Sequence, residues 1–190
     1  MNRILEEGNL RFEFSGFEPV ERFDDKTINA YGMKAVDFVA ESNTDVYFIE
    51  IKDFQHPNAP QGQRDADYKM LVSAVEEKKS VFCLEMGEKI KDSLLRKYSE
   101  GEAFYKNVVY LLVINLDQLG AFERGLLMAK ISGHIPTGLN DERFSAFSKI
   151  TFDLVNAKKL NQYGIICTAK NNKEAVSQGV TISRLDKTKK

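Results

Sequence analysis

The sequence predicts an α/β domain in which helices flank a mixed β-sheet. Three observations support this: two neighbouring segments rich in β-branched and aromatic residues, a long stretch of helical periodicity after them, and a continuous apolar run, VVYLLVI, at residues 108–114. A run of the last kind is typical of a strand that is buried on both faces. Strands that alternate with helices along the chain favour a sheet with helices packed on it.

The composition is that of a soluble globular protein. Of 190 residues, 43% are hydrophobic and 29% are charged, and the formal net charge is -1. This length favours a single domain over residues 1–190. The charge gives no overall attraction for nucleic acid, so any nucleic-acid site must be a local patch. Cys83 and Cys167 lie among apolar neighbours and are expected to be buried free thiols.

The sequence also suggests where the protein resides. The first ten residues, MNRILEEGNL, carry charges where a signal peptide needs an apolar stretch. The run at residues 108–114 is too short to span a bilayer. We therefore expect a cytoplasmic protein with no membrane association.

The first third of the chain has the pattern of strands. Apolar and polar residues alternate over residues 10–14, which predicts a half-buried strand, and residues 17–31 are expected to be a strand that passes into a loop. Residues 34–41 and 45–54 predict a hairpin around a short polar turn. Two prolines and a glycine over residues 56–63 predict a loop that ends it.

The pattern then becomes helical. Residues 65–100 predict two helices broken near Gly87, with apolar faces formed by Tyr68, Leu71, Val72, Val75, Ile90, Leu94, Leu95 and Tyr98. A buried strand at residues 108–116 follows. The next helix is expected to end before Gly133 and to point these residues inward: Leu119, Phe122, Leu126 and Leu127.

The last part of the chain gives weaker signals. We expect a short helix at residues 141–148, a strand at residues 164–170 and a basic tail at residues 186–190. Residues 150–162 fit neither periodicity clearly. The predicted order is therefore strands, helices, strand, helices and strand.

The candidate site lies on the predicted hairpin. Glu50 and Lys52 share one face of the second strand, because side chains alternate along a strand. A hairpin loop of even length, two or four residues, puts Asp37 on that face too, either directly opposite Glu50 or on the diagonal. Two carboxylates and an ammonium group then converge.

This arrangement indicates metal chemistry. Two carboxylates close together in a half-buried sheet repel each other unless a cation joins them. Oxygen ligands without His or Cys favour Mg²⁺ or Mn²⁺. Such a metal polarises a phosphoryl oxygen and lowers the pKa of bound water, while Lys52 can orient that water or stabilise developing charge. The pattern therefore indicates metal-assisted hydrolysis of a phosphodiester bond.

Asp37 on one strand and Glu50-Ile51-Lys52 on the next, followed by a helix and a buried strand, resemble the PD-(D/E)xK nuclease superfamily, which has the restriction-endonuclease-like fold. The resemblance covers a core of about residues 30–116, with helices and a strand added over residues 117–170. It implies that Asp37, Glu50 and the backbone carbonyl of Ile51 hold the metal, and that Lys52 assists the attacking water. Val36 stands where the superfamily has proline.

The resemblance also implies a further acid from the N-terminal part of the chain. Glu6, Glu7, Glu21 and Asp25 are the candidates, and the sequence does not choose among them. His56 lies just beyond the motif strand, near enough to approach the site, although a lone loop histidine is more often exposed than catalytic.

The leading expectation is a nuclease that uses Mg²⁺ or Mn²⁺ on DNA, or less favourably on RNA, with specificity supplied by a homodimer or a protein partner. One alternative is a nuclease-like module that has lost catalysis and binds nucleic acid or protein. Another is a structural ion-pair network of Asp37, Glu50 and Lys52 at a sheet edge.

Overall fold

The computed structural model describes residues 2–24, 32–101, 106–137 and 150–170, and the elements below belong to these ranges. They are β1 (Arg3–Glu7), β2 (Leu10–Phe14), β3 (Val20–Arg22), β4 (Phe38–Glu41), β5 (Asp45–Asp53), α1 (Gln61–Glu76), α2 (Val81–Ser99), β6 (Asn107–Asn115), α3 (Ala121–Ser132), β7 (Ile150–Val155), the 3₁₀ helix η3 (Ala157–Tyr163) and β8 (Ile165–Ala169).

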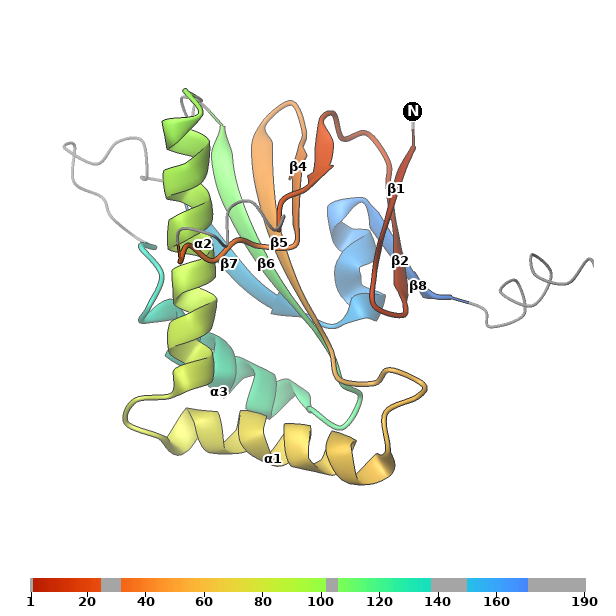
Figure 1. Ribbon diagram of the computed structural model, residues 1–190, viewed down its shortest axis with the longest axis vertical. Helices are drawn as coiled ribbons and strands as arrows, with labels where there is room; N and C mark the ends of the chain where they lie inside the picture. Colours follow the sequence, from red (N-terminus) through yellow and green to blue (C-terminus); the bar gives the residue numbers. More distant parts are fainter. Residues whose placement is uncertain (1, 25–31, 102–105, 138–149, 171–190) are drawn as a thin grey trace, which may run out of the picture.

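A mixed sheet of five described strands, which we call the main sheet, has the order β3-β4-β5-β6-β7. β4 pairs with β3 and with β5 in antiparallel fashion, whereas β6 pairs with β5 and with β7 in parallel fashion. Helices flank this sheet (Figure 1). The predicted mixed sheet with flanking helices is therefore confirmed, and β5 lies at its centre rather than at an edge.

The expectation of one sheet for all strands is wrong. β2 and β8, both foreseen as strands, lie in a separate antiparallel sheet of described strands, in which β2 pairs with β1 on one side and with β8 on the other; we call it the small sheet. β1 was not predicted. The main-sheet strands are apolar on both faces, so the second face also needs a cover. β2 covers that face with the apolar residues of its alternating pattern, which are Leu10, Phe12 and Phe14.

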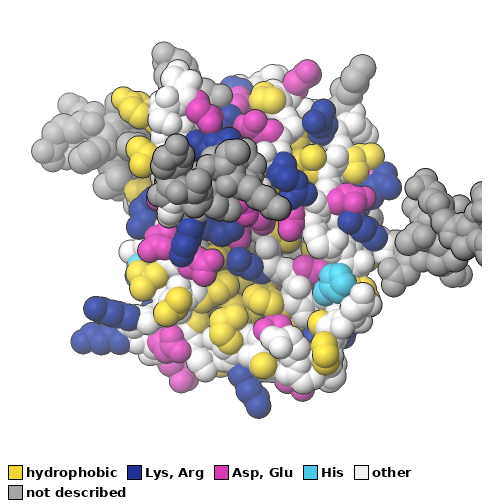
Figure 2. Space-filling model, viewed as in Figure 1, with side chains coloured by type: hydrophobic (Ala, Val, Ile, Leu, Met, Phe, Trp, Pro, Cys, Tyr) yellow, Lys and Arg dark blue, Asp and Glu magenta, His cyan; other side chains and the backbone are white. Residues whose placement is uncertain are grey.

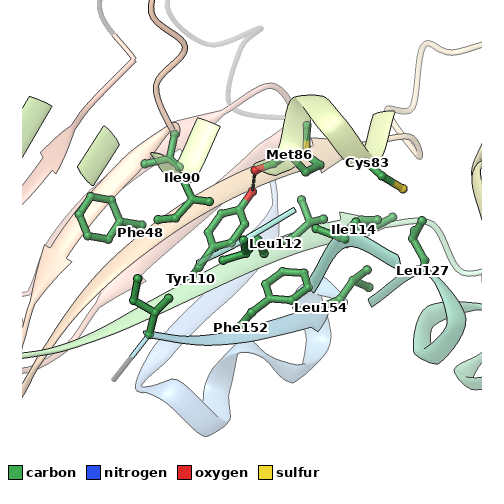
Figure 3. Packing of buried hydrophobic residues seen from close by; sticks show 14 of the residues in the cluster. Phe48, Cys83, Met86, Ile90, Tyr110, Leu112, Ile114, Leu127, Phe152 and Leu154 are labelled. Atoms are coloured by element: carbon green, nitrogen blue, oxygen red, sulfur yellow. Dashed lines mark hydrogen bonds between the residues drawn. The ribbon is translucent and has the colours of Figure 1, made fainter. Parts of the chain in front are cut away.

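The main sheet therefore separates two cores. On one face, α1, α2 and α3 bury apolar side chains against β5, β6 and β7. In this helix-side core the ring of Tyr110 stacks on Phe152, and its hydroxyl donates a hydrogen bond to the carbonyl of Met86 at 3.1 Å (Figure 3). On the other face lie the small sheet and η3 (Figure 1). The second core contains Phe12, Phe14 and Leu160.

The predicted helix break at Gly87 is wrong, because Gly87 lies inside α2. The break comes at residues 77–80, and Ser80 begins α2 by accepting a hydrogen bond from the backbone N–H of Cys83 at 3.3 Å. A serine oxygen at this position satisfies a backbone donor that the first helical turn leaves open. Close packing explains the glycine at this position, because a Cβ on residue 87 would lie 2.7 Å from the carbonyl oxygen of His134.

Gly87→Ala is expected to destabilise the protein by about 1–3 kcal/mol, since overpacking against a backbone outweighs the better helix propensity of alanine. Gly125→Ala is the matched control. Gly125 also lies within a helix, but no atom lies within 4 Å of its would-be Cβ. That variant should gain up to about 1 kcal/mol. Urea unfolding measures both, and a stabilised Gly87→Ala would contradict the packing argument.

The helix faces agree only in part with the prediction. Leu71, Ile90, Leu94 and Leu127 are buried as expected, and Leu119 is buried just before α3. Four residues expected to point inward are exposed: Leu95 (58%), Tyr98 (65%), Phe122 (73%) and Leu126 (41%). Two of these residues belong to α2 and two to α3, so the apolar face predicted for each of these two helices was wider than the face that is buried against the sheet.

The remaining boundaries differ by short distances. α1 begins at Gln61, so the last residues of the predicted loop are helical. The unclear stretch 150–162 becomes β7 and most of η3. Cys83 is buried, but Cys167 is only half-buried, and both are free thiols. The predicted helix at residues 141–148 and the tail at residues 186–190 lie outside the described residues.

Within the described part of the chain, we find no helix that combines the length and the apolar character needed to cross a membrane.

Candidate acidic and lysine site

The β4–β5 hairpin determines where Asp37 and Glu50 meet. Glu41 pairs with Val46, and the backbone N–H of Ser42 donates to the carbonyl of Asp45 at 2.8 Å, so the turn itself is Asn43-Thr44. The loop therefore has two residues, which is one of the two lengths, two or four, that the sequence predicted. The pairing places Phe38 opposite Ile49. One step further in the same register, Asp37 lies opposite Glu50.

Asp37 stands one residue before β4, so the strand predicted to begin at residue 34 is shorter than expected. Its backbone is nevertheless held in line with the sheet, because its carbonyl accepts a hydrogen bond from the N–H of Phe23 at 2.8 Å. Its side chain reaches across the hairpin, where Oδ2 accepts a hydrogen bond from the backbone N–H of Ile51 at 2.6 Å. The carboxylate is thereby fixed beside the motif strand.

Helix α2 anchors the segment that leads into Asp37. The hydroxyl of Ser93 accepts a hydrogen bond from the N–H of Val36 at 3.0 Å, and Oδ2 of Asp92 accepts one from the N–H of Lys34 at 2.8 Å. The described strands offer this segment no partner that would supply those acceptors, and polar side chains of α2 supply them instead. The position of Asp37 therefore depends on α2 as well as on the hairpin.

Ser93→Ala is expected to destabilise the protein by about 1–3 kcal/mol, because it leaves the buried N–H of Val36 without an acceptor. Ser73→Ala, at an exposed position of α1, should change stability by less than about 0.5 kcal/mol. Thermal and urea unfolding of the two variants compare them directly. Equal stability would mean that the Ser93 hydrogen bond does not anchor this segment.

Glu50 is buried in the middle of the main sheet, with 1% of its side chain exposed. Two ammonium groups compensate its charge: Nζ of Lys52 lies 3.0 Å and Nζ of Lys89 lies 2.9 Å from Oε1. Both lysines are themselves largely covered, with 25% and 12% of their side chains exposed. Oε2 of Glu50 has no hydrogen-bond partner among the described residues.

Lys89 was missed by the sequence analysis. It lies on α2 on the same face as Met86, Ile90 and Ser93, which are buried. A lysine on the inward stripe of an amphipathic helix is rare unless an anion lies opposite. That signal was present in the sequence, although the identity of the anion was not.

Burial raises the pKa of both carboxyl groups. Burial raises the pKa of Asp37 to about 7, and the charge of Glu50 adds to the rise, while the charge of Lys89 and the hydrogen bond from Ile51 oppose it. Burial also raises the pKa of Glu50 against the opposing effect of both lysines. Burial lowers the pKa of Lys89, but the charges of Glu50 and Asp37 outweigh that effect and hold it above its ordinary value.

The N-terminal acids named from the sequence have other ion-pair partners. Glu21 pairs with Lys97 at 2.8 Å, and Glu6 pairs with Lys170 at 2.6 Å. Asp25 lies outside the described residues. Asp24, which was not chosen, is the acid from this region whose charge acts on Lys89.

Glu7 and His56 complete the list of predicted neighbours. Glu7 pairs with Arg22 at 2.5 Å, although its charge still contributes slightly to the pKa of Asp37. Nδ1 of His56 accepts a hydrogen bond from the N–H of Asn58 at 3.2 Å, so this ring bonds to the backbone of the loop in which it lies.

Asp37 and Glu50 are the acids of this site that could hold a cation. The charge of Glu50 acts on Asp37, and a buried carboxylate oxygen of Glu50 lacks a donor among the described residues, which suits a hard divalent cation. Among the described residues, no group of three or more His, Cys, Asp or Glu side chains is arranged to hold a metal.

Comparisons with protein-family models, curated proteins and solved structures found no match for this chain.

Proposed function

We propose that the protein is a metal-dependent phosphodiesterase that cleaves nucleic acid, DNA in preference to RNA, with a restriction-endonuclease-like core. The observation that carries this proposal is the hairpin register, which puts Asp37 and Glu50 on the same face of the main sheet, with Glu50 on its central strand. An acid directly before one strand, and on the next strand a second acid followed two residues later by a lysine, match the pattern of the superfamily that the sequence resembles.

The residues fit a single Mg²⁺ or Mn²⁺ ion. Asp37 and Glu50 would hold it, with the carbonyl of Ile51 as a further oxygen donor suggested by the resemblance. The open Oε2 of Glu50 supports this role, because a buried carboxylate oxygen without a donor is costly. A bound divalent ion supplies charge that stabilises the phosphate and makes water a stronger nucleophile.

Lys52 has a separate role in this proposal. Its ammonium group lies next to Glu50 and is the more exposed of the two lysines there. From that position it orients the attacking water and offsets negative charge that develops on the phosphate. Asp37, held by the N–H of Ile51, keeps the site's geometry fixed while substrate binds.

The surface does not suggest strong binding to nucleic acid by a single chain. The net charge is -1, and basic and acidic side chains are interspersed on the face drawn in Figure 2. Tight binding to a polyanion usually uses several unopposed lysine and arginine side chains. We therefore infer that a second copy or a protein partner supplies much of the affinity and the specificity.

One observation favours a second candidate, a non-catalytic module of the same fold. Two carboxylates and two lysines form a set with no net charge when all are ionised, so the cluster is electrically balanced without a metal. In that case the four side chains stabilise the centre of the sheet, and the protein binds nucleic acid or a partner without cleaving it.

Incubation of the purified protein with single-stranded and double-stranded DNA and RNA tests the proposal. We expect cleavage in Mg²⁺ or Mn²⁺ that EDTA abolishes and added metal restores, with DNA cleaved faster than RNA. Cleavage that survives EDTA would contradict the metal dependence. Binding of nucleic acid without cleavage in either metal would favour the non-catalytic module.

A further inference from the structure

Lys89 is the part of the site that the proposed chemistry leaves unused. It comes from α2, far from the hairpin in sequence, and its ammonium group lies 2.9 Å from Oε1 of Glu50. Lys52 lies 3.0 Å from the same oxygen. Two ammonium groups on one carboxylate oxygen exceed what is needed to balance Glu50 alone.

Any cation bound between Asp37 and Glu50 would meet this second ammonium group. The ammonium group of Lys89 and a cation bound to the same carboxylate would carry like charges a few ångströms apart, and such charges repel strongly where water is largely excluded. The side chain of Lys89 is 12% exposed and that of Glu50 is 1% exposed, so solvent screens the repulsion only weakly. Lys89 must therefore oppose a metal that is held by Glu50.

We propose that Lys89 is an internal counter-cation, which pairs with Glu50 in the metal-free protein and competes with a divalent cation for that carboxylate. This inference rests on the proposed metal site. Lys89 then sets the metal concentration at which the site fills. It acts as a positioning residue for Glu50, since its effect passes through that carboxylate.

Calorimetric titration of the purified full chain with Mn²⁺ tests this role without an activity assay. Lys89→Met is expected to bind Mn²⁺ at least about tenfold more tightly than the parent, because the competing charge is gone. Lys89→Arg, which keeps the charge, should remain close to the parent. Lys91→Met is the matched control, being exposed two residues along the same helix, and should also remain close to the parent.

If Lys89→Met fails to fold by circular dichroism, Lys89→Gln serves the same comparisons.

The outcomes separate this inference from the proposed function. Mn²⁺ binding that is equal or weaker in Lys89→Met would overturn the counter-cation role and leave the metal site standing. Absence of Mn²⁺ binding in the parent and in every variant would instead remove the metal site itself, and this inference with it.

Discussion

Asp37→Asn, Glu50→Gln and Lys52→Met are each expected to lower the rate of nucleic-acid cleavage by about 100-fold to 1,000-fold. The first two remove a negative charge from the proposed metal site while keeping the shape of the side chain. The third removes the ammonium group that lies beside Glu50. Initial rates in Mn²⁺ on the best substrate measure the three losses.

Two exposed positions supply controls for this comparison. Asp65→Asn changes an acid on α1, and Lys91→Met changes a lysine on α2, and both side chains face solvent. Both controls should cleave at the parent rate. A site variant that also cleaves at the parent rate would remove that residue from the mechanism. Circular dichroism of each variant separates loss of chemistry from loss of fold.

Asp37→Asn is expected to stabilise the metal-free protein at neutral and alkaline pH. Folding raises the pKa of Asp37 from 3.8 to about 7, so the folded state favours its neutral form. This group contributes full stability below pH 4 and loses it as the pH rises to 7. At about 1.4 kcal/mol per pKa unit, the loss reaches up to about 4 kcal/mol. Asparagine carries no charge, so the variant avoids that loss.

Urea unfolding at pH 4 and pH 8, with EDTA present, measures this effect. The difference between Asp37→Asn and the parent should be small at pH 4 and should grow toward the full value at pH 8. Asp65→Asn should show no such growth, because Asp65 is exposed. A variant that is destabilised equally at both pH values would show that Asp37 is ionised in the folded state at no cost.

Local patterns in the sequence predicted the hairpin and the central strand. Alternation over residues 45–53 put Glu50 and Lys52 on one face, and the two-residue turn put Asp37 opposite Glu50. These features depend on neighbours within about fifteen residues. The same is true of β6, whose unbroken apolar run required burial on both faces.

What the sequence did not reveal depends on distant contacts. The pairing of Glu50 with Lys89 joins a strand to a helix that follows much later, and no local pattern encodes that choice. The role of Gly87 likewise depends on His134, which comes from the chain beyond α3. The small sheet brings β8, near the end of the described chain, beside β2 near its start. Periodicity indicates which residues are buried, but not which distant residues they contact.

The pairing of Glu50 with Lys89 also constrains how the molecule opens. If α2 moved away from the sheet, Lys89 and Glu50 would both regain water, whereas a partial shift would leave one buried charge without its partner. Intermediate positions of the helix are therefore disfavoured, and α2 and β5 should separate together or not at all. Backbone amides of these two elements should then exchange with solvent deuterium through one common opening, with matching free energies.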